Sequence, residues 1–164
     1  MEKSPELSSV KIQANIRDYA TRKFVMKDRK FYFFEETECN IYSIDNRSLT
    51  EHVVEEPAQR EILYSYCEFN GSIYLMQYAD ETMYIYMLNE NDYSWDFLSK
   101  HPVDVGVQIV CSASSASEMT VILIDEDKEM SYFYSYDHMK NLTLQQRVQG
   151  LYYEHLYIPD NIFD

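Results

Sequence analysis

The sequence predicts an all-β fold made of about three four-stranded antiparallel sheets in tandem. Apolar residues recur at every second position in segments such as 83–87 and 131–136, a pattern typical of strands rather than helices. Sixteen tyrosines and eight phenylalanines among 164 residues also favour strands, because aromatic side chains pack well on a pleated surface. A unit of four strand-like segments then recurs three times along the chain, which indicates a repeat fold.

Each unit begins with two strand-like segments joined by a short polar connection. The first segments are 22–26, 61–69 and 107–113, and the second segments are 31–34, 73–76 and 120–124. In the second unit the connection contains Asn70 and Gly71, the dipeptide preferred in two-residue β-hairpins. The first half of each unit is therefore predicted to be an antiparallel hairpin.

The second half of each unit is built around an anchor tyrosine. The three anchors are Tyr42, Tyr86 and Tyr134, which lie 44 and 48 residues apart. Each is followed three positions later by Asp or Asn, then by a polar turn and a last strand-like run. Pro57 and Pro102 stand in the connections between units, where proline can end a strand without removing a ladder hydrogen bond.

Four-stranded units at this spacing are typical of β-propeller blades, and "YIYMLNENDYSWDFL" (84–98) resembles a kelch repeat. Like a kelch repeat, it carries tyrosines on the third strand and a tryptophan, Trp95, on the fourth. The resemblance covers residues 22–148, and the positions of the usual glycine pair read "EETE", "YADE" and "DEDK". It implies a small or incomplete β-propeller that acts as a scaffold or recognition module.

Three units do not make up the usual four to eight blades of a closed ring. We expect one domain over 1–164, divided into an N-terminal extension (1–21), blades at 22–56, 57–101 and 102–148, and a terminal strand or further blade (149–164). The alternating segments 10–16 and 151–159 are predicted to pair and close the ends. Otherwise the open edges recruit a second copy or a partner by strand addition. A single β-barrel or sandwich is the alternative fold.

The charge of the chain excludes some classes of function. Asp and Glu total 28 against 14 Lys and Arg, a net charge of -14, so the surface would repel a nucleic-acid backbone. No segment approaches the ~20 apolar residues of a membrane helix, and the first residues lack the apolar core of a secretory signal. We therefore expect a cytoplasmic or nuclear protein whose three cysteines are reduced.

Acidic side chains recur in the loop predicted between the second and third strands of each unit. They are Glu35, Glu36 and Glu38, then Asp80 and Glu81, and finally Asp125, Glu126 and Asp127. In a meander these loops emerge at one end of the sheets, so the carboxylates are predicted to attract a partner protein with a basic surface. The simpler interpretation is that they are solvated loops of an acidic protein. A calcium site at Asp125, Asp127 and Glu129 is a weaker alternative, because no glycine follows to fold the loop around an ion.

No motif in the sequence predicts catalysis, a metal or a cofactor. Four histidines are scattered without metal-ligand spacing, and three glycines in the whole chain exclude glycine-rich phosphate loops. The sequence therefore predicts a non-enzymatic protein–protein interaction module that binds through its acidic loops or an open strand edge. The alternative is a small-ligand-binding barrel or propeller enzyme with a tyrosine-lined pocket.

Overall fold

The computed structural model describes residues 24–34, 38–55, 57, 63–115 and 117–151. Within them the strands are β1 (Phe24–Lys27), β2 (Lys30–Phe34), β3 (Glu38–Ser43), β4 (Ser48–Val53), β5 (Leu63–Phe69), β6 (Ser72–Ala79), β7 (Thr82–Asn89), β8 (Ser94–Pro102), β9 (Ile109–Ser114), β10 (Met119–Asp125), β11 (Met130–Tyr136) and β12 (Leu142–Gln149). They form three antiparallel sheets of four strands in chain order, here named blade 1 (β1–β4), blade 2 (β5–β8) and blade 3 (β9–β12). The prediction of an all-β fold with three four-stranded units is confirmed.

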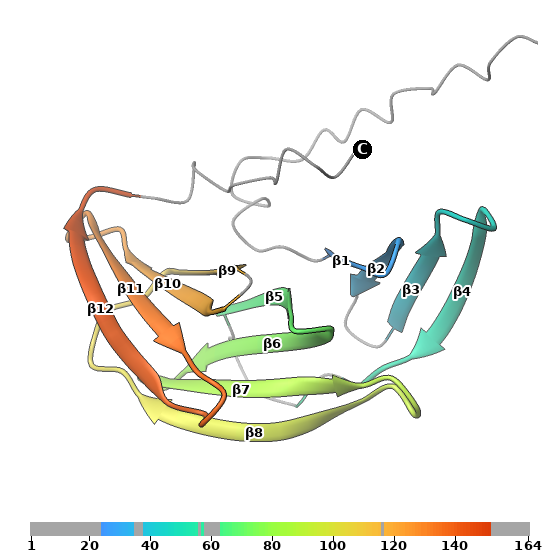
Figure 1. The fold of residues 1–164 in the computed structure, drawn as a ribbon. Coiled ribbons are helices and arrows are strands. Elements are labelled where there is room, and N and C mark those ends of the chain that lie inside the picture. Colours follow the sequence, from blue (N-terminus) through green and yellow to red (C-terminus); the bar gives the residue numbers. More distant parts are fainter. Residues whose placement is uncertain (1–23, 35–37, 56, 58–62, 116, 152–164) are drawn as a thin grey trace, which may run out of the picture.

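The three blades follow one another around an arc (Figure 1). The first strands, β1, β5 and β9, lie next to one another on the inside of the arc, and the fourth strands lie at its outer edge. This is the arrangement of successive propeller blades, in which each sheet packs its face on the next one. The alternative of a single barrel or sandwich is wrong, because the described strands form three separate four-stranded sheets rather than one closed sheet or two facing sheets.

Two-residue turns with a left-handed backbone join β1 to β2, β5 to β6 and β6 to β7. Asn70 and Gly71 have φ angles of 49° and 74°, as the predicted hairpin requires. Asp80 and Glu81 form a turn of the same kind between β6 and β7, with φ angles of 48° and 53°. The carboxylate of Glu68 accepts a hydrogen bond from the backbone N–H of Gly71 at 2.7 Å, which fixes the β5–β6 hairpin further.

The anchor tyrosines occupy the same register in all three blades. The equivalent rows of paired residues are Met26–Phe31–Tyr42–Leu49 in blade 1, Tyr66–Leu75–Tyr86–Phe97 in blade 2 and Ser112–Val121–Tyr134–Leu144 in blade 3. A shift in register also precedes Tyr86 and Tyr134, as a β-bulge would produce at the same point of blades 2 and 3. The repeat seen in the sequence is therefore also a repeat of strand pairing.

Two apolar layers hold the blades together. In the layer between blades 1 and 2, the rings of Phe34 and Tyr66 stack with centroids 4.5 Å apart, and Leu75 and Tyr86 are buried beside them. The layer between blades 2 and 3 is rich in methionine and includes Met76, Met83, Met119 and Leu123. Burying one such side chain contributes roughly 1.5–3 kcal/mol, so the contacts between sheets stabilise this fold.

Several expectations concern residues outside the described ranges. These are the segments 10–16 and 152–159, together with Glu35 and Glu36. The division of the chain into domains stays a prediction. The described residues include no helix of the length and apolar character needed to cross a membrane.

Candidate interaction surface

The described acidic residues of the predicted site lie at one end of the blades. Glu38 begins β3, Asp80 and Glu81 form the turn after β6, and Glu126 and Asp127 follow β10. These positions are brought together because the connections after β2, β6 and β10 are equivalent in the repeat. The role of this acidic end in binding a partner stays a prediction.

Asp125 differs from its neighbours because its side chain is only 2% exposed. Its carboxylate accepts a hydrogen bond from the backbone N–H of Lys128 at 3.0 Å and forms an ion pair with the Lys128 ammonium at 2.9 Å. The hydrogen bond from the Lys128 side chain is the main cause that holds the pKa of Asp125 below its ordinary value. Asp125 thus stabilises the β10–β11 turn. The described residues contain no group of three or more His, Cys, Asp or Glu side chains that could hold a metal ion.

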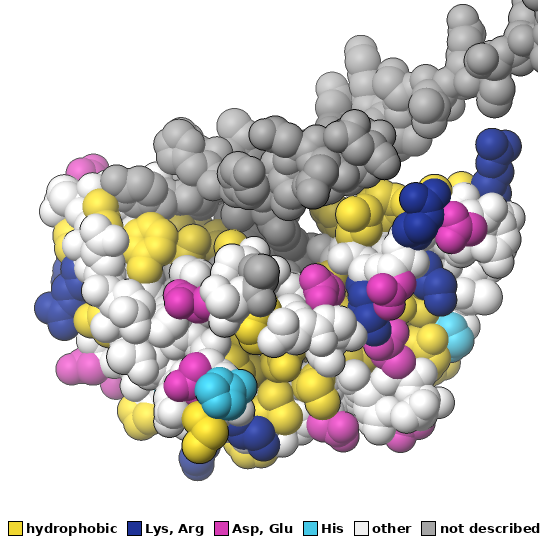
Figure 2. Space-filling model, viewed as in Figure 1, with side chains coloured by type: hydrophobic (Ala, Val, Ile, Leu, Met, Phe, Trp, Pro, Cys, Tyr) yellow, Lys and Arg dark blue, Asp and Glu magenta, His cyan; other side chains and the backbone are white. Residues whose placement is uncertain are grey.

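Blade 1 has an apolar face that no other described blade covers. Strand alternation places seven apolar side chains on the side turned away from blade 2, namely Phe24, Met26, Phe31, Phe33, Tyr42, Leu49 and Val53. Five of them are exposed, and the Phe33 ring lies 6.1 Å from the Phe24 ring and 6.2 Å from the Phe31 ring, centroid to centroid. Figure 2 shows hydrophobic side chains gathered over the top of blade 1. We name this set the blade 1 outer face.

The equivalents of Phe33 and Tyr42 are buried or half-buried in blades 2 and 3. Tyr42 is 36% exposed, whereas its equivalent Tyr86 is 7% exposed. Phe33 is 41% exposed, whereas Gln77 and Leu123, at the same point of β6 and β10, are fully buried. In blades 2 and 3 these positions lie in the layers formed with the preceding blade. The blade 1 outer face therefore resembles one half of an interface between blades.

Two carboxylates lie on the same side of blade 1 as the apolar residues. Glu38 and Glu51 are exposed, and strand alternation from Tyr42 and Leu49 places both on the outer face. The described basic residues of this blade lie elsewhere, with Lys27 and Lys30 on the opposite face and Arg29 and Arg47 in turns. The described charged side chains on the outer face of blade 1 are therefore acidic.

The other end of the arc is packed differently. The outward side of blade 3 consists of Cys111, Ile122 and Ile124, which are buried, and Phe133 and Leu151 pack against them.

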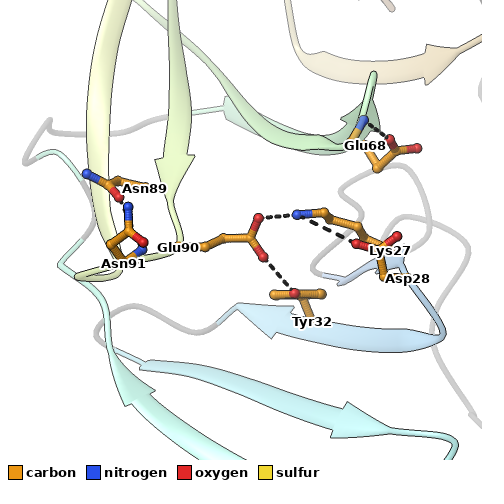
Figure 3. A network of polar contacts seen from close by, with 8 residues as sticks. Lys27, Asp28, Tyr32, Glu68, Asn89, Glu90 and Asn91 are labelled. Atoms are coloured by element: carbon orange, nitrogen blue, oxygen red, sulfur yellow. Dashed lines mark hydrogen bonds and ion pairs between the residues drawn. The ribbon is translucent and has the colours of Figure 1, made fainter.

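A polar network fixes the inner side of blade 1 to blade 2 (Figure 3). Glu90, in the turn after β7, accepts a hydrogen bond from the Tyr32 hydroxyl at 2.8 Å and forms an ion pair with the largely buried Lys27 ammonium. Burial alone would raise the pKa of Glu90, but the hydrogen bonds from Lys27 and Tyr32 together lower it below its ordinary value of 4.5. Burial, assisted by the Glu90 carboxylate, raises the pKa of the Tyr32 hydroxyl. The same two causes raise the pKa of the Cys39 thiol to about 12.

Glu90→Gln is expected to lower the free energy of unfolding by about 1 kcal/mol at pH 7, because Lys27 loses its counter-charge. A carboxyl group with a lowered folded pKa stabilises the fold above its unfolded pKa, and this contribution disappears as pH falls through the folded pKa. The difference in free energy of unfolding between the unaltered protein and Glu90→Gln should therefore be largest near pH 7 and shrink below about pH 4.5. Urea denaturation between pH 7 and pH 3 measures it, with Glu118→Gln on the exposed β9–β10 connection as the control. A difference independent of pH would contradict the ion pair.

The tyrosines that the alternative function placed in a pocket pack between sheets where they are buried. Tyr66 and Tyr86 belong to the layer between blades 1 and 2, and Tyr136 belongs to the layer between blades 2 and 3. The Tyr136 hydroxyl shares a hydrogen bond with the Ser99 hydroxyl at 3.0 Å. These side chains therefore have a structural role in joining blades.

The comparisons with known proteins assign no family to this chain. No family model matches the chain, and no curated protein matches it. Among solved structures, the WD40 domain of SCAP from fission yeast is similar, with a TM-score of 0.46 and 9% sequence identity. The match covers 71% of this chain but 30% of that structure, so the chain spans less than a third of its length. The assignment of propeller-type blades rests on the three sheets of this chain, and the kelch resemblance stays a prediction.

Proposed function

We propose that the protein is a non-enzymatic interaction module that binds a partner protein on the blade 1 outer face. The observation that carries this proposal is the exposure of Phe33 and Tyr42. The equivalents of Phe33 are fully buried in blades 2 and 3, and those of Tyr42 are buried in blade 2 and half-buried in blade 3. Exposed apolar clusters on a protein surface mark interaction sites, and burial of the cluster would supply the main favourable free energy. The partner would occupy the place of a preceding blade, which is consistent with the recognition role implied by the kelch resemblance.

The charges on this chain favour a partner that is not a second copy. Two copies with a net charge of -14 repel each other, and Glu38 and Glu51 add negative potential on the docking face. A protein that presents apolar side chains flanked by Lys or Arg would satisfy both features of the face. The acidic turns at one end of the blades would speed its approach, and added salt would slow it.

Phe33→Ser is expected to weaken partner binding by at least about tenfold, because a large aromatic side chain at an interface centre often accounts for more than about 2 kcal/mol. Tagged wild-type and variant proteins would be used to capture partners from an extract of the source cells. Each captured protein would be identified by mass spectrometry, purified and titrated against both forms. Phe97→Ser is the matched control, because Phe97 is also an exposed aromatic residue and lies on the outer strand of blade 2. Equal binding by the Phe33→Ser protein would refute the proposal.

A further inference from the structure

Strand β4 forms one edge of blade 1, and among the described strands it pairs with β3 alone. We propose that the partner protein lays an extended segment along β4, so that blade 1 continues into a fifth strand supplied by the partner. The inference rests on the proposed function, because β4 carries Leu49 and Val53 of the blade 1 outer face. It names the form in which the partner contacts that face.

β4 lacks the features that protect the corresponding edges of blades 2 and 3. The pairing of β8 and of β12 with the preceding strand is interrupted by a shift in register, whereas β3 and β4 pair without a shift over their whole length. β8 also carries Lys100 and ends at Pro102, and β12 carries Arg147. Bulges, basic side chains and proline all oppose the pairing of another strand with an edge. β4 contains neither proline nor Lys or Arg, so its edge is the one open to an added strand.

The exposure of β4 agrees with this difference. Every residue of the strand except His52 is exposed, whereas β8 and β12 alternate between exposed and half-buried positions over much of their length. The backbone N–H and C=O groups on the side away from β3 are those that an extended segment would pair with. Strand addition would give these groups partners from protein in place of water.

The side chains of β4 define the sequence that the added strand needs. Leu49, Glu51 and Val53 alternate along the outer face, and Leu49 and Val53 are 57% and 75% exposed. Side chains directly opposite each other on neighbouring strands lie within about 5.5 Å and interact. The added strand therefore requires an apolar residue beside Leu49, Lys or Arg beside Glu51, and an apolar residue beside Val53. This order is symmetric about Glu51, so it is the same for a parallel and an antiparallel segment.

Charge argues against a second copy of the chain as the added strand. Two β4 strands paired antiparallel about Glu51 would place the two Glu51 carboxylates directly opposite each other, which is destabilising. The net charge of -14 on each copy adds to the repulsion. The segment that fits β4 therefore belongs to a different protein and has a basic residue between two apolar ones.

A short peptide tests this inference on the full chain. The probe is Ser-Ile-Thr-Lys-Thr-Ile-Ser with blocked ends, and a second peptide carries Glu in place of Lys. The Lys peptide is expected to shift the NMR signals of the β4 backbone amides at concentrations up to about 1 mM. It should bind on the order of tenfold more tightly than the Glu peptide. The Lys peptide with N-methyl groups on its three central residues should not bind, because both of its edges then lack N–H donors.

Two charge reversals show whether Glu51 reads the central residue of the peptide. Glu51→Lys should invert the preference, so that the Glu peptide becomes the tighter ligand. Asp96→Lys is the matched control, because it makes the same change in charge at an exposed acidic residue of β8 and should leave the preference unchanged. The amide signals of β6 report whether each variant is folded. If Glu51→Lys is not folded, the N-methylated peptide decides.

Three results would overturn the inference: no shift of the β4 amides with the Lys peptide, equal binding of the N-methylated peptide, or an unchanged preference in Glu51→Lys. Light scattering without peptide identifies a second copy, and a dimer whose dissociation changes the β4 amide signals would also overturn it. Loss of the partner by Phe33→Ser, with no peptide bound along β4, would leave the proposed function intact and remove only the added strand.

Discussion

Tyr86→Ala is expected to lower the free energy of unfolding by about 3–5 kcal/mol, whereas Tyr42→Ala should lower it by less than about 1 kcal/mol. The two tyrosines hold the same register position in neighbouring blades. Tyr86 is 7% exposed in the layer between blades 1 and 2, and its ring meets the Phe97 ring at 5.6 Å between centroids. Removing it leaves a cavity between two sheets. Removing the Tyr42 ring takes away a surface contact only.

Urea denaturation followed by circular dichroism measures both free energies, and unchanged denaturant slopes would show that the variants unfold in the same way. Tyr134→Ala provides a third member of the series, because Tyr134 is half-buried against the layer between blades 2 and 3. The loss of free energy of unfolding in Tyr134→Ala should fall between the losses in Tyr42→Ala and Tyr86→Ala. Similar costs for Tyr42 and Tyr86 would contradict the position of blade 1 against blade 2.

The local features of the fold could be predicted from the sequence. The period of two in segments such as 131–136 marks strands, because successive side chains point to opposite faces. Asn70 and Gly71 mark a hairpin, because both accept the positive φ that a two-residue turn requires. The spacing of the anchor tyrosines then revealed the repeat, because strand length and turn length together fix the size of one blade.

The interaction surface was harder to predict, because exposure depends on which sheet lies next to a residue. The alternating pattern of blade 1 is that of a buried sheet, and Phe33 has the same place in its blade as the fully buried Leu123. The link between Lys27 and Glu90 joins residues 63 positions apart, so no local pattern could reveal it.

The exposure of the acidic residues was equally hard to predict from the sequence. Asp80 and Asp125 have similar places in their units, yet Asp80 is exposed in a tight turn and Asp125 is buried. The difference arises because the connection before β9 passes close to Asp125, and a Cβ atom at Gly106 would lie 3.4 Å from its carboxylate oxygen Oδ2. Contacts of this kind come from the path of a loop, which composition does not determine.

Gln77→Leu is expected to raise the free energy of unfolding by about 1–3 kcal/mol, because a buried amide without hydrogen bonds carries a desolvation penalty of that order. Gln77 is fully buried, and neither its Oε1 nor its Nε2 atom has a hydrogen-bond partner. The repeat supplies a precedent for an apolar residue, since blade 3 has the fully buried Leu123 at this position. Leucine should therefore fit the layer between blades 1 and 2 without an amide to desolvate.

Two companion variants separate polarity from packing at this site. Gln77→Met keeps the length of the side chain and should also stabilise the protein, whereas Gln77→Ala removes the amide but leaves a cavity and should give no gain. Thermal and urea denaturation of the three variants would provide the comparison. A loss of more than about 1 kcal/mol with both leucine and methionine would contradict the prediction, because it would mean that the amide is hydrogen-bonded in the folded protein.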